Sequence, residues 1–255
     1  MFGIVDWLIA AFVVITGLAA GSFLNVCIDR IPAGRSVVYP PSACDSCGHP
    51  LAWADLVPIV SWLWLRGECR YCGQSIGLQA IWVELAAGGL YFLAYLRFGL
   101  TFSTVLAIVF FSILLVVSVI DYHLQVIPEL VLLSGVILAI PLQIAISWDG
   151  FLGSLIAAAG AGSAMYLLYR LVPGGMGFGD VELAAFLGLF LGPRLTGLAV
   201  MMGFIIGGAV GVGLLVTRIK GRKDAVPFGP FLAAGGALAL LAGPELIRWY
   251  LAFWQ

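Results

Sequence analysis

Long apolar runs are the feature that most constrains how this chain can fold. Of its 255 residues, 62% are hydrophobic and only 10% are charged, and the mean hydropathy is +1.11. A soluble domain carries about 25% charged residues. Because a chain that crosses lipid must satisfy its backbone hydrogen bonds internally, such runs predict helices. We therefore expect an all-α polytopic membrane protein with about eight transmembrane helices and one small soluble domain.

The expected spans follow from length, since about 20 mostly apolar residues cross a bilayer. We place them at residues 5–27, 79–97, 101–121, 127–147, 150–171, 181–193, 195–217 and 226–250. The sixth is short, and the glycines beside it predict a tilted or partly re-entrant helix buried among the others. The chain then divides into a first helix (1–28), a soluble domain (29–78) and a membrane core (79–255).

Basic residues predict the orientation, because Lys and Arg concentrate on the cytoplasmic side. With the 29–78 loop on that side, the chain's 12 basic residues divide nine to three. The nine are Arg30, Arg35, Arg66, Arg70, Arg170, Arg218, Lys220, Arg222 and Lys223, and the three are Arg97, Arg194 and Arg248. The N-terminus then lies outside, and Asp121 and Asp180 both lie at cytoplasmic helix ends. A net charge of −1 gives no argument for nucleic-acid binding.

Four of the five cysteines form two C-x-x-C pairs in the soluble loop, Cys44 with Cys47 and Cys69 with Cys72. Closed structural zinc sites use four tetrahedral ligands, commonly all sulfur. Cytoplasmic thiols stay reduced, so a metal is favoured over the alternative, a disulfide or redox pair. A loop of roughly 50 residues is also only marginally stable without a cross-link. We expect a structural zinc ion, and we expect Cys27 to be a packing residue.

A run of glycines ends in an acid at Gly177-Phe178-Gly179-Asp180, directly before an apolar segment. An ionisable group at membrane depth is a functional hypothesis by default. Its expected partner is Asp121. Two nearby carboxyls cannot easily both ionise, so one holds a proton. The ionised carboxylate can take a proton from water while the other protonates a substrate carbonyl. The alternative is that each acid is solvated at the headgroup level or caps a helix.

Other polar and small residues near these acids are candidates for supporting roles. Glu84, Glu129 and Glu182 are each expected to join a structural pair or to line a cavity. Gly177 and Gly179 are expected to let an extended peptide approach the backbone. Asp55, in the soluble loop, is expected to be solvated.

Several motifs are spread along nearly the whole chain. They are Gly21-Ser22-Phe23-Leu24-Asn25-Val26, the cysteine tetrad, Asp121 followed by Ile127-Pro128, Gly177-Phe178-Gly179-Asp180, and Pro227-Phe228-Gly229-Pro230-Phe231. Together they resemble the type IV prepilin peptidases, also called leader peptidases/N-methyltransferases. This family belongs to the wider GxGD intramembrane aspartic proteases.

The resemblance implies two activities. In the first, Asp121 and Asp180 hydrolyse the peptide bond that joins the basic leader to type IV prepilins and type II secretion pseudopilins. This hydrolysis takes place at the cytoplasmic face of the bacterial inner membrane. The second is methylation of the new N-terminal amine with S-adenosyl-L-methionine. The family commonly has Lys where this chain has Glu182, and Asp where it has Glu129. The implied partners are these substrates and membrane lipid, with no nucleic acid.

Two other classes of function compete with this hypothesis. An ion- or proton-coupled transporter with a zinc-knot domain also uses intramembrane acids and broken helices. It needs an acid on a continuous path across the bilayer, whereas both leading acids here are expected at one face. A non-catalytic scaffold with a zinc docking site would tolerate loss of both aspartates and fail without the cysteines.

Overall fold

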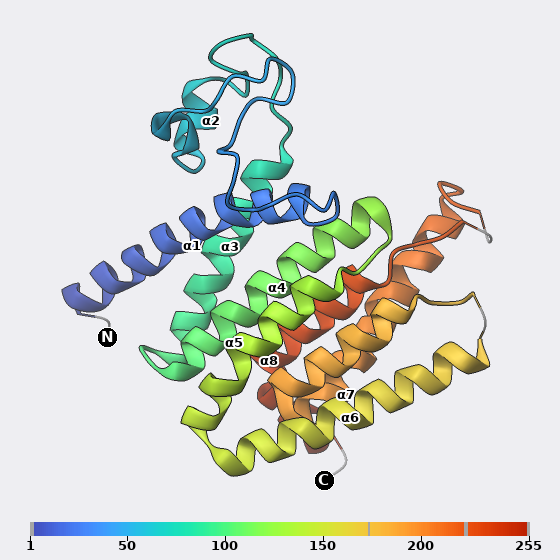
Figure 1. Cartoon of the computed structure of the whole chain (residues 1–255). Helices are drawn as coiled ribbons and strands as arrows, with labels where there is room; N and C mark the ends of the chain where they lie inside the picture. The colour runs from blue at the N-terminus through green and yellow to red at the C-terminus, as the bar shows by residue number, and fades with distance from the viewer. Residues whose placement is uncertain (1–2, 173, 222–223, 254–255) are drawn as a thin grey trace. The chain divides into compact units, whose positions relative to one another are not determined.

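The computed structural model describes residues 3–172, 174–221 and 224–253. Arg222 and Lys223, used above for orientation, lie outside these ranges. The helices are α1 (Ile4–Arg30), η1 (Trp53–Leu56), α2 (Val60–Trp64), α3 (Gln79–Phe98), α4 (Phe102–Leu124), α5 (Glu129–Ile146), α6 (Trp148–Leu171), α7 (Phe178–Val216) and α8 (Gly229–Ala252) (Figure 1). They form two compact units, Met1–Leu100 and Thr101–Gln255.

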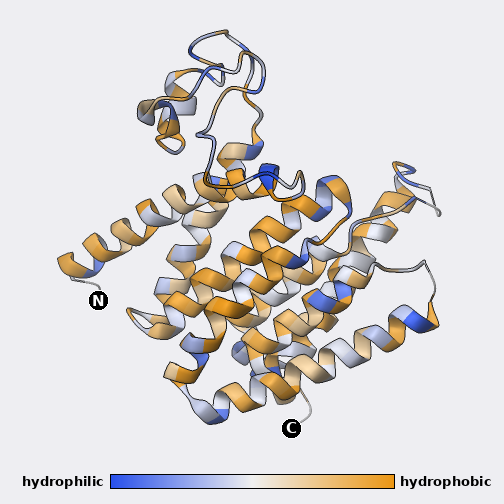
Figure 2. Cartoon of the chain, viewed as in Figure 1, coloured by the Kyte–Doolittle hydropathy of each residue, from blue (hydrophilic) through white to orange (hydrophobic). Residues whose placement is uncertain are grey.

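Among the described residues, seven helices are long and apolar enough to cross a membrane, namely α1 and α3 to α8. Hydrophobic colours dominate these helices in Figure 2, while the segment between α1 and α3 is mixed. The described chain has isolated bridges but no strand element. The prediction of an all-α polytopic membrane protein is therefore confirmed.

The expected sixth and seventh spans are the two halves of α7. Its 39 residues contain one non-helical position, Gly192, with φ 69° and ψ 178°, followed by Pro193. Only glycine adopts this backbone conformation readily, and proline cannot donate the next helical hydrogen bond. Contacts with α8 show that the chain reverses there: Leu187 meets Gly236, Leu195 meets Gly243, and Gly207 meets Phe231. α7 is thus a helical hairpin, and the seven long helices contain eight apolar segments.

The first half of α7 lies inside unit 2. Nearly every residue from Asp180 to Leu191 is buried, as predicted for a short helix surrounded by others. Residues 178–191 rise about 20 Å, less than the roughly 30 Å hydrocarbon core. Such a segment is stabilised by its protein neighbours more than by lipid.

Aromatic packing between α4 and α7 sets the depth of the two predicted catalytic acids. The Phe110 ring lies 6.1 Å from the Phe186 ring and 5.1 Å from the Phe190 ring, centroid to centroid. Stacked aromatic side chains bury large apolar areas and fix their helices against each other. Asp121 lies about three turns beyond Phe110, and Asp180 about three turns before Phe190, in the same direction from the shared core. The packing therefore brings both acids to one end of the unit.

In unit 1, small residues bring α1 and α3 into close contact. A Cβ at Gly21 would lie 2.6 Å from the Glu84 Cα, and one at Gly17 would lie 2.8 Å from the Gly88 Cα. Small residues four positions apart commonly permit such close packing of membrane helices. Beyond α1, the Arg30 guanidinium donates hydrogen bonds to the carbonyls of Ser36, Pro40 and Pro41. These bonds hold the chain where it leaves the helix.

Candidate active site and metal site

Two buried carboxyls from distant parts of unit 2 meet in one cavity. Asp121 lies in the last turn of α4 and is 5% exposed, and Asp180 lies in the first turn of α7 and is 6% exposed. Both line a cavity of about 750 Å³ and are close enough for their charges to interact. The helix topology, and no local spacing in the sequence, produces this pair.

Backbone amides at two helix starts hold these carboxyls. The Gly229 amide donates to Asp121 Oδ2 at 2.9 Å, and the Gly177 amide donates to Asp180 Oδ2 at 3.0 Å. Gly229 opens α8 and Gly177 is the N-cap of α7. The positive end of a helix dipole stabilises a negative charge at this position. Each carboxyl therefore has one oxygen fixed in place by a backbone amide.

The predicted supporting residues Gly177, Gly179 and Glu129 line the same cavity. A Cβ at Gly179 would lie 2.7 Å from the Cβ of Ile127, so the absent side chain lets α7 begin against the connection between α4 and α5. At Gly177 the atom nearest to an added Cβ would be Asp180 Oδ2, at 3.8 Å. Approach of a peptide to these glycines stays a prediction.

Sequence reasoning assigned no role to Asp224, a further acid of this cavity, whereas Glu182 was expected to join a structural pair or to line a cavity. Glu182 and Asp224 also line it, and the charges of Glu129 and Glu182 interact. Its described lining thus includes five carboxyls and no Lys, Arg or His: Asp121, Glu129, Asp180, Glu182 and Asp224. The position of Asp224 depends on residues 224–228 lying at the cavity, which no local pattern indicates.

The four paired cysteines form one cluster. Their Sγ atoms all lie within 4.8 Å of one another, so the cluster could hold a metal ion. The two cysteine turns have matching backbone hydrogen bonds: Gly48 N to Cys44 O, Cys44 N to His49 O, Gly73 N to Cys69 O, and Cys69 N to Gln74 O. This symmetry presents two sulfurs from each turn, which suits a tetrahedral site.

The thiols of this cluster differ in acidity. Hydrogen bonds from the amides of Cys47 and Ser46 lower the pKa of Cys44 to about 6. The pKa of Cys72 is raised to about 12, because burial and the neighbouring thiols outweigh the opposing effect of the Gln74 amide. Four sulfurs this close cannot all carry charge without a cation. A bound metal would stabilise the thiolates together.

Asp55 braces the second cysteine turn. Its side chain is 3% exposed, and Oδ1 accepts a hydrogen bond from Arg70 Nε at 2.6 Å. Burial alone would raise the pKa of Asp55, but the Arg70 guanidinium and the Ala52 amide lower it overall. The expectation of a solvated Asp55 is therefore wrong. The reason is that η1 folds against the turn that carries Arg70, a contact between segments 15 residues apart.

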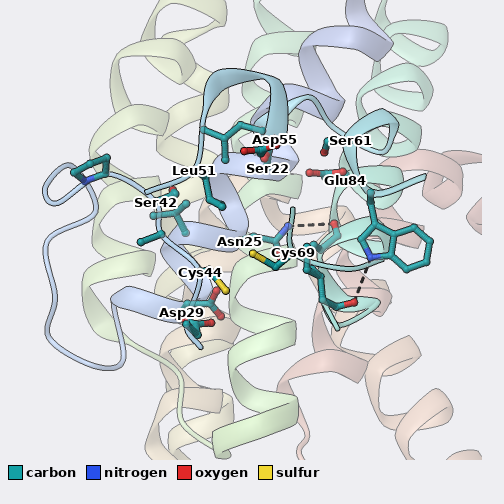
Figure 3. Close-up of a pocket in the computed structure, with 18 of the residues that line it drawn as sticks. Ser22, Asn25, Asp29, Ser42, Cys44, Leu51, Asp55, Ser61, Cys69 and Glu84 are labelled. Carbon is teal, nitrogen blue, oxygen red and sulfur yellow. Dashed lines mark hydrogen bonds between the residues drawn. The ribbon is translucent and has the colours of Figure 1, made fainter. Parts of the chain in front are cut away.

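A second cavity, of about 350 Å³, lies within unit 1 among the end of α1, the start of α3 and the cysteine-containing segment (Figure 3). The buried Glu84 lines it, and Glu84 Oε2 accepts a hydrogen bond from the Ile59 amide at 2.8 Å. Asn25 lines it as well. Its Nδ2 donates to the carbonyls of Gly21 and Ala80, whereas its buried Oδ1 has no partner among the described residues.

Comparison with known proteins gives matches along most of the chain. Residues 15–98 match the bacterial peptidase A24 N-terminal domain, and residues 108–212 match the type IV leader peptidase family. No solved structure matches significantly.

Three relatives are each called prepilin leader peptidase/N-methyltransferase. The Bacillus subtilis protein is 32% identical over 93% of this chain and 96% of its own length. The protein of Aeromonas hydrophila is 31% identical over 96% and 94%, and that of Burkholderia pseudomallei (strain 1026b) is 34% identical over 91% and 85%. These relatives give no support to the transporter alternative. The resemblance seen in the motifs is confirmed, and the chain belongs to the type IV leader peptidase family.

Proposed function

We propose that this protein is a membrane aspartic endopeptidase that removes the basic leader of type IV prepilins and pseudopilins and N-methylates the new N-terminus. The observation that carries the peptidase half is the pairing of Asp121 and Asp180. Two buried carboxyls, each held by a backbone amide, line one cavity large enough for a peptide segment. The names of the relatives support the same two activities.

Hydrolysis by this pair needs no metal and no covalent intermediate. One carboxyl is ionised and accepts a proton from a water molecule, which attacks the scissile carbonyl carbon. The other carboxyl donates its proton to the carbonyl oxygen. Collapse of the tetrahedral intermediate breaks the C–N bond, and the departing amine takes a proton from the dyad. The amide bonds from Gly177 and Gly229 hold the two carboxyls in position through these transfers.

The acidic lining of the cavity supports a basic leader as its occupant. Glu129, Glu182 and Asp224 add negative charge beside the dyad, and no described lining residue is cationic. A cleft lined by charges of one sign attracts ligands that carry the opposite charge. Lys or Arg side chains of a leader would offset this charge.

The methyl-transfer half would use unit 1. S-adenosyl-L-methionine, when bound, supplies an electrophilic methyl group to the lone pair of the neutral amine and leaves as a thioether. Cys44, Cys47, Cys69 and Cys72 would hold a structural Zn²⁺, because four sulfurs within 4.8 Å fit a closed tetrahedral site. In this proposal residues 29–78 form the metal-binding domain between the first helix (1–28) and the membrane core (79–255).

The bacterial relatives support the bacterial inner membrane as the location. The distribution of basic residues supports an orientation with the N-terminus outside. The 29–78 segment and the ends of α4 and α7 that carry the dyad would then face the cytoplasm. A basic leader, which does not cross the bilayer easily, would stay on that side.

Cleavage of a prepilin-like substrate in reconstituted membranes tests the proposal. Wild type, Asp121→Asn and Asp180→Asn are compared, with mass spectrometry of the product N-terminus. We expect either substitution to abolish cleavage, and the wild-type product to gain the mass of one methyl group.

Asp149→Asn is the matched control, because Asp149 is an exposed acid in the first turn of α6. It should cleave like wild type. Folded Asp121→Asn and Asp180→Asn proteins that still cleave would refute the dyad mechanism.

A further inference from the structure

The pocket of unit 1 has a polar group without a partner. Asn25 is fixed in orientation, because its Nδ2 donates to the carbonyls of Gly21 and Ala80 at 3.1 and 3.2 Å. Its Oδ1 is consequently directed elsewhere, and this atom is buried with no partner among the described residues. A buried acceptor left unpaired costs about 1–3 kcal/mol. The structure therefore contains an oriented acceptor for a donor that no described residue supplies.

The same pocket has a buried carboxylate and a strained wall. Glu84, 7% exposed, accepts hydrogen bonds from the Ile59 amide and the Ser22 hydroxyl. Ile59 has φ 61°, which a β-branched residue rarely adopts. Strained backbone of this kind persists only when its surroundings hold it, and it is frequent at ligand sites. Glu84 thus fixes the wall formed by the segment between η1 and α2.

The chemistry of the lining suits a small amphipathic cation. Carboxylates of Asp29, Asp45, Asp55 and Glu84 line the pocket. All three arginines of the lining already have partners: Arg70 pairs with Asp55, and Arg30 and Arg35 donate to backbone carbonyls. Apolar walls come from residues such as Trp62 and Ile81. A volume of about 350 Å³ lies within the usual range of small-molecule pockets, roughly 300–1,000 Å³.

We propose that this pocket binds S-adenosyl-L-methionine, with Asn25 Oδ1 accepting a hydrogen bond from it and Glu84 holding the Ile59 wall around it. The proposal rests on the methyl-transfer half of the proposed function. The ammonium and hydroxyl groups of S-adenosyl-L-methionine can donate a hydrogen bond to Asn25 Oδ1. Its sulfonium cation suits the carboxylates of the lining, and its flat aromatic base suits the apolar walls. The cavity that holds Asp121 and Asp180 is a separate one in unit 2.

Equilibrium dialysis of radiolabelled S-adenosylmethionine against the full-length protein in lipid nanodiscs tests the assignment without relying on turnover. Asn25→Ala removes the acceptor, and Val26→Trp fills the pocket from α1 at a residue whose side chain has no polar atom. We expect each to weaken binding at least about tenfold. Asn25→Ala leaves a donor of the ligand unpaired, and Val26→Trp takes up the space of the ligand, and either change should cost about 1.4 kcal/mol or more of binding free energy. The control is Val5→Trp, the same exchange on the same helix at a position 67% exposed.

Two other measurements separate the possible failures. Metal content reports whether unit 1 is folded, and cleavage of a prepilin-like substrate reports on unit 2. If Asn25→Ala and Val26→Trp proteins with full metal content bind as tightly as wild type, the pocket assignment is wrong while the proposed function stands. If wild type neither binds S-adenosylmethionine nor yields a methylated product, the methyl-transfer half of the proposed function is wrong. The pocket assignment, which depends on it, is then wrong too.

Discussion

Asp121 depends on a residue 108 positions away in the chain, because its Oδ2 is held by the Gly229 amide. The approach of this backbone is closer than any side chain would permit. A Cβ at Gly229 would lie 2.6 Å from Asp121 Oδ2 and 3.1 Å from its Cγ. The start of α8 is thus part of the geometry of the dyad.

Gly229→Ala is expected to lower the cleavage rate by about a hundredfold or more, because a displacement of about 1 Å at a reacting group has this effect. The rate constant at saturating substrate is the measurement. Gly208→Ala is the matched control, since a Cβ there meets no atom within 4 Å. Equal rates for the two variants would mean that Asp121 tolerates the shift.

The acids beside the dyad give a second prediction. Glu182→Gln should reduce kcat/KM for a substrate with a basic leader at low salt, because the cavity then loses one of the negative charges that attract the leader. The loss should shrink as ionic strength rises, since screening weakens interactions between exposed charges. A substrate with a neutralised leader serves as the control and should be cut equally by both proteins. An equal loss on both substrates would assign Glu182 to positioning of the dyad.

At the scale of helices, local sequence patterns predict most of what is observed. The expected starts and ends of α3, α4, α5 and α6 agree with the structure within a few residues, because lipid leaves hydropathy as the dominant signal. The cysteine cluster was also predictable, because the spacing of each C-x-x-C pair places two thiols in one turn. The positions of Asp55 and Asp224 were not predictable, because they depend on contacts between distant segments that no local pattern indicates.

The reversal at Gly192 can be tested through stability. Ala at this position would have to adopt φ 69° and ψ 178°, a region that is essentially restricted to glycine. We expect Gly192→Ala to destabilise the protein by about 1–3 kcal/mol, measured as a lower Tm in lipid or detergent. Gly197→Ala, five residues along the same helix with open space at its Cβ, should leave the Tm near wild type. A Tm that stays unchanged in Gly192→Ala would show that the hairpin does not need this backbone conformation.

At the scale of the whole molecule, the two units hold different chemistry. The cysteine cluster and the Asn25 pocket lie entirely within the first unit, and Asp121 and Asp180 lie within the second. Loss of one site therefore need not abolish the other.

Removal of the metal provides the corresponding prediction. Chelation, or Cys44→Ser, should abolish N-methylation because the 29–78 segment loses its cross-link, while cleavage by the second unit falls much less. Mass spectrometry of the product reports both events in one sample. Cys27→Ser, a change at a cysteine outside the cluster, is the control. Parallel loss of both activities on chelation would show that cleavage also requires the metal-bound loop.

The hairpin of α7 also bears on how the protein enters the membrane during synthesis. Its first half is too short to remain stably in a bilayer by itself, and it is buried against α4, α5 and α6, which precede it in the chain, as well as against α8. In the proposed orientation the turn carries the exposed Arg194 to the outer face. The two halves would therefore leave the translocon as a pair, with the second and more fully apolar half driving the transfer of one positive charge across the bilayer.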